Sequence, residues 1–436
     1  PSAGDSELRS TRRAGARIAC RSPMTRAPIA VVGAGLAGLA CAWHLQRRGR
    51  DVVVVEAASQ VGGLLRTDRV DGFQLDRGFQ VLQTAYPEAR AVLDLEGLRL
   101  HSFDSGARTR RNGRFAAVYD PLRHPSRVWS SLRSGIFTLG DAWRVLALLR
   151  SVRGVSLETL LRRPAVSARE KIARLGFSEK FTEAFLEPFY RGVLLERELA
   201  SSSRIFEFTF RMFASAPVAL PENGIRALPE QLARRLEADS IALEAPVESI
   251  GEGSLRLSDG REFEVSATVI ATDAATASRW VPSIPESEWN AVSCVYFAAH
   301  RAPLRGRLLI LDGERQGPVN HLSFPSEVCP AYAPNNRTLV SATVLGDPAE
   351  DDAALTKAVR DQLRDWWGRE VDDWEPLRVD RIRHATPLQS PAWLEPATRS
   401  VRLGPALFVC GGHRETSSIG GALRSGRRAA ESVLRT

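Results

Sequence analysis

The chain has 436 residues, a formal net charge of +8, 44% hydrophobic residues and 25% charged residues. Its length exceeds that of one typical domain, and its ordinary globular composition excludes a disordered or fibrous protein. The positive charge comes almost wholly from arginine, since the chain has only three lysines. This bias indicates a GC-rich coding sequence rather than nucleic-acid binding. No apolar stretch is long enough to span a bilayer.

Residues 1–23 have the features of a leader. Arg12, Arg13, Arg17 and Arg21 lie among small residues without the apolar core of a signal peptide. We expect this segment to be disordered and outside the fold, either as a transit-type presequence or as sequence upstream of a start at Met24. The five scattered cysteines form no C-x-x-C pair, which favours reduced thiols and a cytoplasmic location.

The most informative segment is a glycine-rich turn between two apolar runs. Residues 29–32 are followed by Gly33-x-Gly35-x-x-Gly38 and a helical pattern that ends near residue 50. A second apolar run, residues 51–55, ends at Glu56. The order strand, glycine turn, helix, strand and acidic residue is that of a dinucleotide-binding unit.

Each part of this unit has a predicted role. Gly33 allows the sharp turn, Gly35 lets the backbone approach a pyrophosphate, and Gly38 lets the helix pack close to the strand. The amides of Leu36 and Ala37 open the helix, where its dipole favours a diphosphate. We expect Glu56 to accept hydrogen bonds from ribose hydroxyls and to repel a 2′-phosphate.

A second glycine pair indicates which dinucleotide is bound. After Glu56 and Ala57, the chain reads Val61-Gly62-Gly63-Leu64-Leu65-Arg66-Thr67, which a nicotinamide-binding domain does not require. This arrangement resembles the FAD-binding oxidoreductases that include protoporphyrinogen oxidase, phytoene desaturase and the flavin amine oxidases. The resemblance implies that Ala57, Gly62, Gly63, Leu64 and Arg66 lie along the diphosphate and the isoalloxazine ring. The alternative is that Gly62-Gly63 is only a loop.

The remaining pattern predicts a mainly helical stretch from about 108 to 216, and then mixed elements. Strands alternate with single helices, and hairpin spacing between 290 and 345 favours an antiparallel sheet with one helix on its face. The predicted helices are 128–136, 140–152, 168–175, 178–189, 352–367 and 420–434, with a further helix opened by residues 221–228 and running through residue 236. The predicted strands are 241–244, 247–250, 255–257, 262–265, 268–272, 292–299, 308–311, 319–324, 339–345, 377–384 and 407–412.

This order resembles the same flavin family along nearly the whole length from Met24. The resemblance implies an α/β fold with a Rossmann-like FAD-binding domain of the three-layer, glutathione-reductase type. That domain is assigned to residues 24–108, 218–285 and 385–436. An inserted α+β substrate domain with an antiparallel sheet is assigned to residues 109–217 and 286–384.

The resemblance also implies FAD contacts near the C-terminus. Ile419, Gly420, Gly421 and Ala422 open a helix with small residues, so their amides are expected to approach flavin N1 and the C2 carbonyl. An ordinary surface helix is the alternative. By the same resemblance the backbone of Val247 meets the adenine, and Ala271 lies on the pyrophosphate side.

One departure from the family pattern bears on FAD retention. Relatives usually have Gly-Asp where this chain has Gly411-Gly412, followed by His413 and Glu415. Glu415 or a backbone amide could replace the aspartate, and His413 could face the flavin or lie behind it. Both glycines are nevertheless assigned to the cofactor site.

The substrate is expected to be apolar. Phenylalanines between residues 189 and 213 could line a ligand channel or belong to the core. Arg191 and Arg204 could bind carboxylates or pair with Glu187 and Glu207. Residues 286–345 contain no lysine, in contrast to typical amine oxidases, and the cysteine pattern of covalent flavin attachment is missing.

We therefore expect noncovalent FAD and hydride removal from a hydrophobic, isoprenoid, carotenoid or porphyrin-like small molecule, with oxygen or quinone as electron acceptor. The alternatives are a redox-neutral flavin-dependent isomerase, an amine oxidase or an inactive flavin-binding protein. No catalytic residue is assigned, because the cofactor performs the difficult step. No metal site is expected either, because the seven histidines are scattered along the chain. The pattern is compatible with contact at the surface of a membrane, but not with a span across it.

Overall fold

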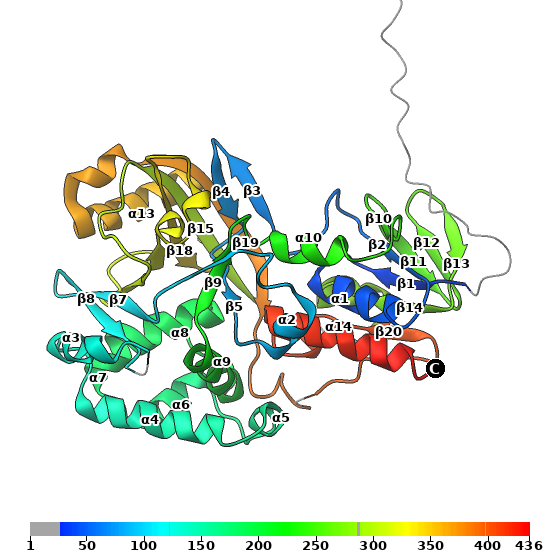
Figure 1. Ribbon diagram of the computed structural model, residues 1–436, viewed down its shortest axis with the longest axis horizontal. Coiled ribbons are helices and arrows are strands. Elements are labelled where there is room, and N and C mark those ends of the chain that lie inside the picture. The colour runs from blue at the N-terminus through cyan, green and yellow to red at the C-terminus, as the bar shows by residue number, and fades with distance from the viewer. Residues whose placement is uncertain (1–26, 122, 286–287, 397) are drawn as a thin grey trace, which may run out of the picture.

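The computed structural model describes residues 27–121, 123–285, 288–396 and 398–436. The leader expected at residues 1–23 lies outside these ranges. In Figure 1 a unit built on a parallel sheet lies on the right, and a larger sheet with most of the remaining helices lies on the left.

A five-stranded parallel sheet is the centre of the first unit, with the order β10-β2-β1-β14-β20. In β1, Ile29 and Val31 pack against helices, whereas Ala30 and Val32 pack against a second sheet. Because both faces are buried, the strand reads as an unbroken apolar run. The strands are β1 (Ile29–Val32), β2 (Val52–Val55), β10 (Ile241–Ala242), β14 (Ala267–Ile270) and β20 (Leu407–Val409).

Different layers cover the two faces of this sheet. Most of the helices of this unit lie on one face, and an antiparallel sheet of three strands lies on the other. The helices are α1 (Leu36–Gln46), α2 (Pro87–Val92), α10 (Ala227–Ala233), α11 (Ala274–Trp280) and α14 (Ile419–Val433). The strands are β11 (Val247–Gly251), β12 (Ser254–Leu257) and β13 (Glu262–Glu264).

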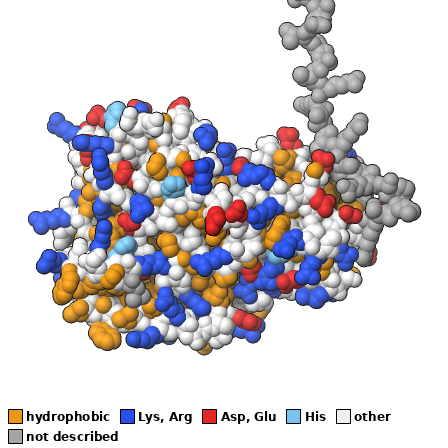
Figure 2. Space-filling model, in the orientation of Figure 1, with side chains coloured by type: hydrophobic (Ala, Val, Ile, Leu, Met, Phe, Trp, Pro, Cys, Tyr) orange, Lys and Arg blue, Asp and Glu red, His pale blue; other side chains and the backbone are white. Residues whose placement is uncertain are grey.

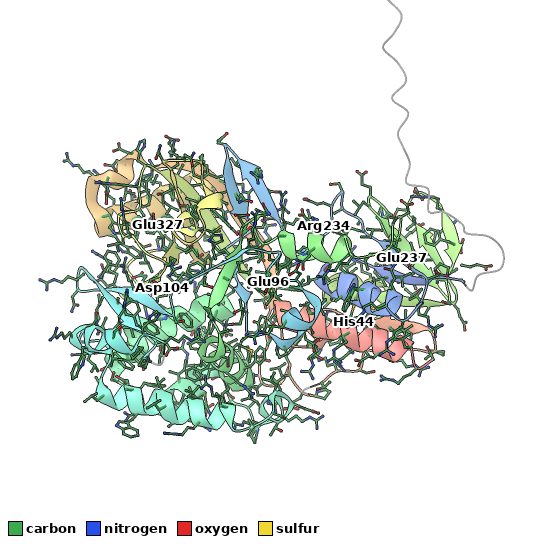
Figure 3. The ribbon with its side chains drawn as sticks, viewed as in Figure 1. His44, Glu96, Asp104, Arg234, Glu237 and Glu327 are labelled. Atoms are coloured by element: carbon green, nitrogen blue, oxygen red, sulfur yellow. The ribbon has the colours of Figure 1, made fainter. Side chains whose placement is uncertain are left out.

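Helices α1 and α14 come from the two ends of the described chain and lie side by side, close to His44 (Figure 3). Glycine makes this close approach possible, since a Cβ on Gly426 would lie 2.3 Å from Ala37 O. The C-terminal helix therefore forms part of the wall around the glycine turn.

The second sheet has seven strands in the order β19-β15-β18-β17-β16-β7-β8. Helix α13 (Asp352–Trp367) packs on one face through an apolar cluster, while the other face packs against residues of the short connecting segments, among them Leu75 and Leu220. The strands are β7 (Gly106–Arg111), β8 (Arg114–Tyr119), β15 (Trp289–Ala299), β16 (Leu309–Asp312), β17 (Val319–Ser323), β18 (Thr338–Leu345) and β19 (Glu375–Pro387).

The β7–β8 hairpin corrects the expectation of a mainly helical stretch that begins near residue 108. Asn112 and Gly113 join the two strands with φ of 52° and 70°. Positive φ at both positions is typical of the two-residue turns that match the twist of a hairpin. Strand β7 pairs with β16, so residues 106–108 belong to the seven-stranded sheet rather than to the parallel-sheet unit.

A helical layer lies below this sheet in Figure 1 and forms its own apolar core. The predicted helix at 178–189 is present as α7, a π-helical turn over Thr182–Leu186, and α8. In the described part of the chain, no helix combines the length and apolarity needed to span a membrane. The helices are α3 (Val128–Arg133), α4 (Leu139–Arg153), α5 (Leu157–Leu161), α6 (Ala168–Leu175), α7 (Glu179–Phe181), α8 (Glu187–Leu194) and α9 (Ser203–Ser215).

Short elements join these parts. Two small antiparallel sheets have the orders β3-β4 and β5-β9-β6, and their strands lie between the parallel-sheet unit and the rest of the molecule in Figure 1. Their strands are β3 (Thr67–Val70), β4 (Phe73–Asp76), β5 (Leu82–Gln83), β6 (Leu100–Ser102) and β9 (Val218–Pro221). The remaining short elements are the helix α12 (Pro325–Val328) and the 3-10 helices Pro125–Arg127, Pro330–Tyr332, Gly368–Asp373 and Gly412–Arg414.

Candidate functional site

A cavity of about 1890 Å³ extends from the carboxyl ends of the parallel strands to the helical layer and the seven-stranded sheet. Its lining includes Gly33, Glu56, Ala271 and Gly411, which follow β1, β2, β14 and β20. The carboxyl edge of a parallel sheet is where α/β proteins bind ligands. The geometry therefore places the candidate site at this edge.

The glycine turn has the geometry that the sequence predicts. Gly33 has a φ of +112°, and a Cβ there would lie 2.9 Å from Ala271 O. A Cβ on Gly38 would lie 2.0 Å from Gly33 O, so only glycine lets α1 pack this close. Gly35 is different, because a Cβ there would have nothing within 4 Å. The bare side of Gly35 faces open space in the cavity wall.

Glu56 organises the same turn. One carboxylate oxygen accepts a hydrogen bond from the Ala34 amide (2.7 Å) and the other accepts one from the Ala58 amide (2.9 Å). Glu56 also lines the cavity. The side chain thus fastens the loop after β2 to the glycine turn and still presents a carboxylate edge to a ligand.

Most of the predicted cofactor residues line this one cavity, although they come from four separated segments of the chain. Those that line it are Gly33, Gly35, Leu36, Ala37, Glu56, Ala57, Gly62, Gly63, Leu64, Ala271, Gly411, Gly412, Ile419 and Ala422. Those outside the lining are Gly38, Arg66, Val247, Gly420 and Gly421. Val247 begins β11 and packs beneath the parallel sheet.

The glycines of α14 have a packing role that the sequence did not indicate. A Cβ on Gly420 would lie 2.7 Å from the Tyr86 ring, and one on Gly421 would lie 1.9 Å from Thr416 O. The Gly421 amide donates to Ser418 Oγ (3.0 Å), which caps the helix. These glycines fit α14 against its neighbours, and the residues of α14 that reach the cavity are Ile419 and Ala422.

The segment after Gly411-Gly412 answers one of the questions that the sequence left open. Glu415 is buried in an ion pair with Arg428 (2.5 Å) and is not among the residues that line the cavity. Its carboxylate is therefore not aimed at the position that the usual aspartate would serve. His413 does line the cavity, and burial beside Arg414 and Arg399 lowers its pKa to about 3, so its ring is neutral.

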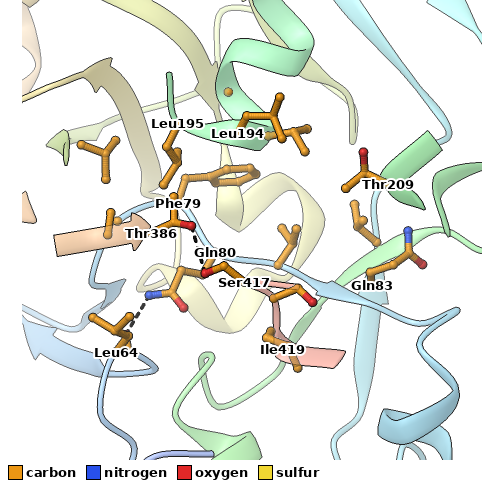
Figure 4. A pocket seen from close by; sticks show the side chains of 18 of the residues that line it. Leu64, Phe79, Gln80, Gln83, Leu194, Leu195, Thr209, Thr386, Ser417 and Ile419 are labelled. Carbon is orange, nitrogen blue, oxygen red and sulfur yellow. Dashed lines mark hydrogen bonds between the residues drawn. The ribbon is translucent and has the colours of Figure 1, made fainter. Parts of the chain in front are cut away.

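Figure 4 shows the middle of the cavity, where several segments converge. Gln80 Nε2 donates to Leu64 O (2.9 Å), and Thr386 Oγ1 donates to Ser417 Oγ (2.9 Å). Gln83 lies on the same side of this view as Thr209. Its Oε1 accepts from the Ala85 amide (2.9 Å), while its Nε2 is buried without a hydrogen-bond partner among the described residues.

The helical layer supplies the apolar wall. Phe206 belongs to the core, whereas several other aromatic side chains of the same helices face the cavity. Arg191 pairs with Glu187, as one alternative from the sequence had it, but Arg204 pairs with Glu395 rather than with Glu207. The cavity-lining aromatic residues of this layer are Phe137, Phe181, Phe185, Phe189, Tyr190, Phe208, Phe210 and Phe213.

Sequence reasoning missed the polar residues that the seven-stranded sheet and β4 contribute. Arg378 and Asp380 of β19 and His321 of β17 line the cavity. Arg378 is ion-paired to Asp380 (2.7 Å) and to Asp68 (2.8 Å). Their sequence signal is weak, because isolated polar residues in a strand do not reveal which face they occupy.

Asp76 is a buried carboxylate at the junction of the two units. It accepts hydrogen bonds from Thr67 Oγ1 (2.5 Å), the Ile225 amide (3.0 Å) and the Tyr332 hydroxyl (2.7 Å). Burial raises the pKa of Asp76 from its ordinary 3.8 to about 6, against the opposing effect of these donors. The carboxylate therefore links β3, the turn before α10 and the seven-stranded unit.

This raised pKa leads to a pH-dependent prediction. Because the folded chain binds the Asp76 proton more tightly than the unfolded chain does, the contribution of this group to stability falls as the pH rises from about 4 to about 6. We expect wild type to lose up to about 3 kcal/mol relative to Asp76→Asn across this window. Urea unfolding of both proteins at several pH values measures the difference, and parallel pH profiles would contradict the prediction.

No grouping of three or more His, Cys, Asp or Glu side chains suited to a metal ion occurs within the described ranges. The four cysteines in those ranges, Cys41, Cys294, Cys329 and Cys410, are free and buried. The cavity thus joins a glycine-lined turn at the edge of the parallel sheet to an aromatic chamber.

Comparison with known proteins agrees with this architecture. Protoporphyrinogen oxidase 2 from Arabidopsis thaliana is 46% identical over 71 residues, a match that covers 16% of this chain and 14% of the relative. The mitochondrial protoporphyrinogen oxidase of Nicotiana tabacum is 24% identical, with 93% of this chain and 94% of the relative covered.

A solved structure shares the fold. Cyclohexylamine oxidase from Brevibacterium oxydans superposes with a TM-score of 0.68 at 18% identity, over 94% of this chain and 99% of that one. The family model for flavin containing amine oxidoreductases matches residues 36–434. The chain therefore belongs to the flavin containing amine oxidoreductase family, and it is a flavin-dependent oxidoreductase.

Proposed function

We propose that the protein binds FAD noncovalently and removes a hydride from a hydrophobic small molecule. The observation that carries the proposal is the single cavity that joins the glycine turn to an aromatic chamber. FAD, when bound, supplies the hydride acceptor. The protein then has to hold the cofactor, orient an apolar substrate and exclude water.

The residues present fit this cofactor. The open space at Gly35 accommodates a diphosphate, and the first turn of α1 presents the positive end of its dipole there. Glu56 is placed to accept hydrogen bonds from ribose hydroxyls. Gln83 Nε2, buried and unpartnered among the described residues, supplies a donor for an acceptor-rich ring. We assign the whole set of predicted cofactor residues that line the cavity to this role.

The arrangement of the two large sheets also supports a proposal for the fold type and the domain bounds. We propose a Rossmann-like, glutathione-reductase-type FAD domain from residues 24–105, 218–285 and 388–436. The substrate domain would then comprise residues 106–217 and 286–387, because β7 and β19 belong to the seven-stranded sheet. The cysteines, all free within the described ranges, are consistent with the cytoplasmic location that we propose.

The aromatic wall favours an isoprenoid, carotenoid or porphyrin-like substrate, with oxygen or quinone as the final acceptor. Amine oxidation is the second candidate, and the family membership of the chain favours it. Against it, residues 286–345 contain no lysine. On β17 of the seven-stranded sheet, the residue that lines the cavity is His321.

The absorbance spectrum of the purified protein tests the proposal. We expect bound flavin bands that are released on denaturation, as noncovalent binding requires. Anaerobic bleaching by an apolar hydride donor would support dehydrogenation, and turnover only after prior reduction, with no net electron transfer, would support an isomerase. A protein that stays colourless after incubation with FAD would contradict all three enzyme assignments.

We also propose peripheral contact with an anionic membrane, through an apolar surface formed by Trp129, Leu139 and Trp143. These side chains are 71%, 68% and 68% exposed, and hydrophobic atoms gather over α3 and α4 at the lower left of Figure 2. Residues 123–155 contain several exposed arginines and one acidic residue, Asp141, which is buried. Exposed tryptophans among basic residues suit an interface with anionic lipid.

Replacement of both Trp129 and Trp143 by alanine should weaken membrane binding by at least about tenfold, because each indole buries apolar area in the bilayer interface. Co-sedimentation with phosphatidylcholine–phosphatidylglycerol vesicles measures this change. Vesicles of phosphatidylcholine alone should bind wild type less. Equal binding of wild type and variant would contradict the proposed contact.

A further inference from the structure

His321 is a buried histidine that the cofactor assignment does not use. It lies on β17, is 2% exposed and lines the cavity on the side of the seven-stranded sheet. Its cross-strand partner on β18, Thr343, lines the cavity too. A Cβ on Gly192 would lie 2.7 Å from His321 Nδ1, so glycine in α8 makes room for the ring.

The neighbouring amide fixes the proton on this ring. Asn320 Nδ2 donates to Pro188 O (3.0 Å), which only the NH₂ group of the amide can do. The same nitrogen lies 3.0 Å from His321 Nδ1, so its second hydrogen is donated to that ring nitrogen. A neutral imidazole that accepts at Nδ1 carries its hydrogen on Nε2.

Nε2 is therefore a hydrogen-bond donor, and it has no acceptor among the described residues. Phe79 lies against the imidazole with a centroid distance of 5.4 Å and an interplanar angle of 68°. Phe79 lines the cavity as well, and Figure 4 shows it between Leu194, Leu195 and Thr386. Because Phe79 and His321 are in contact and both line the cavity, we infer that displacement of this phenyl ring gives a ligand access to the imidazole.

The surroundings select the charge of that ligand. Burial alone lowers the pKa of His321 to about 4, with no contribution from a neighbouring charge. The ring is neutral near pH 7, so it offers an anion no opposite charge, and its N–H repels an ammonium group. An unmet donor in an apolar wall is instead matched by an uncharged acceptor oxygen.

We propose that His321 is a specificity-determining residue whose Nε2–H donates to an uncharged acceptor oxygen, such as a carbonyl, on an apolar ligand in this cavity. This inference deepens the proposed function and rests on it for the statement that the cavity takes a small apolar substrate. His321 thereby orients the end of the ligand that lies on the seven-stranded sheet. It also disfavours alkylammonium substrates.

The test uses two probes of nearly the same shape, benzophenone and 1,1-diphenylethylene, which differ by a carbonyl in place of a terminal alkene. Calorimetric titration of the full-length protein as isolated should give about tenfold tighter binding of the ketone. His321→Phe should bring the two affinities close together, and His321→Gln should restore part of the preference. Phe79→Ala should enlarge the preference, because it uncovers the donor.

His300→Phe, a surface change of the same kind, should leave the preference at its wild-type value. Equal wild-type affinities, a preference that survives in His321→Phe, or no measurable binding of either probe would overturn the proposal. The readout does not depend on flavin. A colourless protein that prefers the ketone would contradict the proposed redox function alone, whereas a yellow protein without the preference would contradict the role of His321 alone.

Discussion

Replacement of Gly35 by aspartate is expected to yield a folded protein without flavin. Gly35 has ordinary extended backbone geometry, with φ −70° and ψ 173°, and a Cβ there has nothing within 4 Å, so the fold accepts a side chain. The new carboxylate would stand against the anionic bridge of the cofactor in a partly enclosed site. We expect FAD affinity to fall by at least about 3 kcal/mol, which is more than about hundredfold.

Flavin content per purified protein, read from the absorbance spectrum, measures this loss, and circular dichroism verifies the fold. Gly35→Asn is the matched control, because it has nearly the same volume and no charge, and it should retain more flavin than Gly35→Asp. Stoichiometric flavin in the aspartate variant would contradict the assignment of this turn to a diphosphate.

Replacement of Gly38 by alanine is expected to lower the stability of the fold, rather than to affect only the binding of flavin. Glycine-to-alanine changes inside a helix ordinarily favour the helix by about 1 kcal/mol. At Gly38 we expect the opposite sign, because the new Cβ would lie 2.0 Å from Gly33 O and 3.1 Å from Ala271 Cβ. Helix α1 would have to move away from β1 and β14, at a cost of about 3 kcal/mol or more in unfolding free energy.

Urea unfolding monitored by circular dichroism measures this cost. Gly35→Ala is the control within the same motif, and it should unfold at nearly the wild-type denaturant concentration, since its Cβ enters open space. If Gly38→Ala were as stable as wild type, the close packing of α1 on the parallel sheet would be wrong. Within one motif, substitutions at Gly35 thus test cofactor binding, whereas a substitution at Gly38 tests the packing of α1.

Elements with a strong local pattern could be predicted from the sequence. The buried valine runs of β1 and β2 and the α13 helix have the expected type and nearly the expected bounds. The β7–β8 hairpin was missed because its strands carry Arg108, Arg110 and Arg111 in place of an alternating apolar pattern. Its Asn112-Gly113 turn was the available signal, since this pair is typical of two-residue hairpins.

The residues of the candidate site likewise fall into those that the local sequence predicts and those that depend on tertiary contacts. The glycine turn and Glu56 are local in sequence, and the structure shows the sharp turn at Gly33 and the close packing at Gly38, whereas the cofactor contacts of Gly35 and Glu56 stay predictions. The roles of Gly420, Gly421 and Glu415 depend on Tyr86, Thr416 and Arg428, which only the tertiary structure brings to them. The role of His321 could not be predicted from the sequence. The position of its proton depends on Asn320, whose orientation is fixed by a hydrogen bond to Pro188 on another element.

The order of strands in the parallel sheet also constrains biosynthesis. Ile29 pairs with Ala267, β20 follows β14 at the edge, and α14 covers α1. In a nascent chain β1 and β2 can pair with each other early, but their outer neighbours β14 and β10 are made only after residue 240, so their apolar side chains stay uncovered until more than half of the polypeptide has been synthesised. Truncations from the carboxyl end, even short ones, should consequently be handled by chaperones and proteases rather than accumulate as active enzyme.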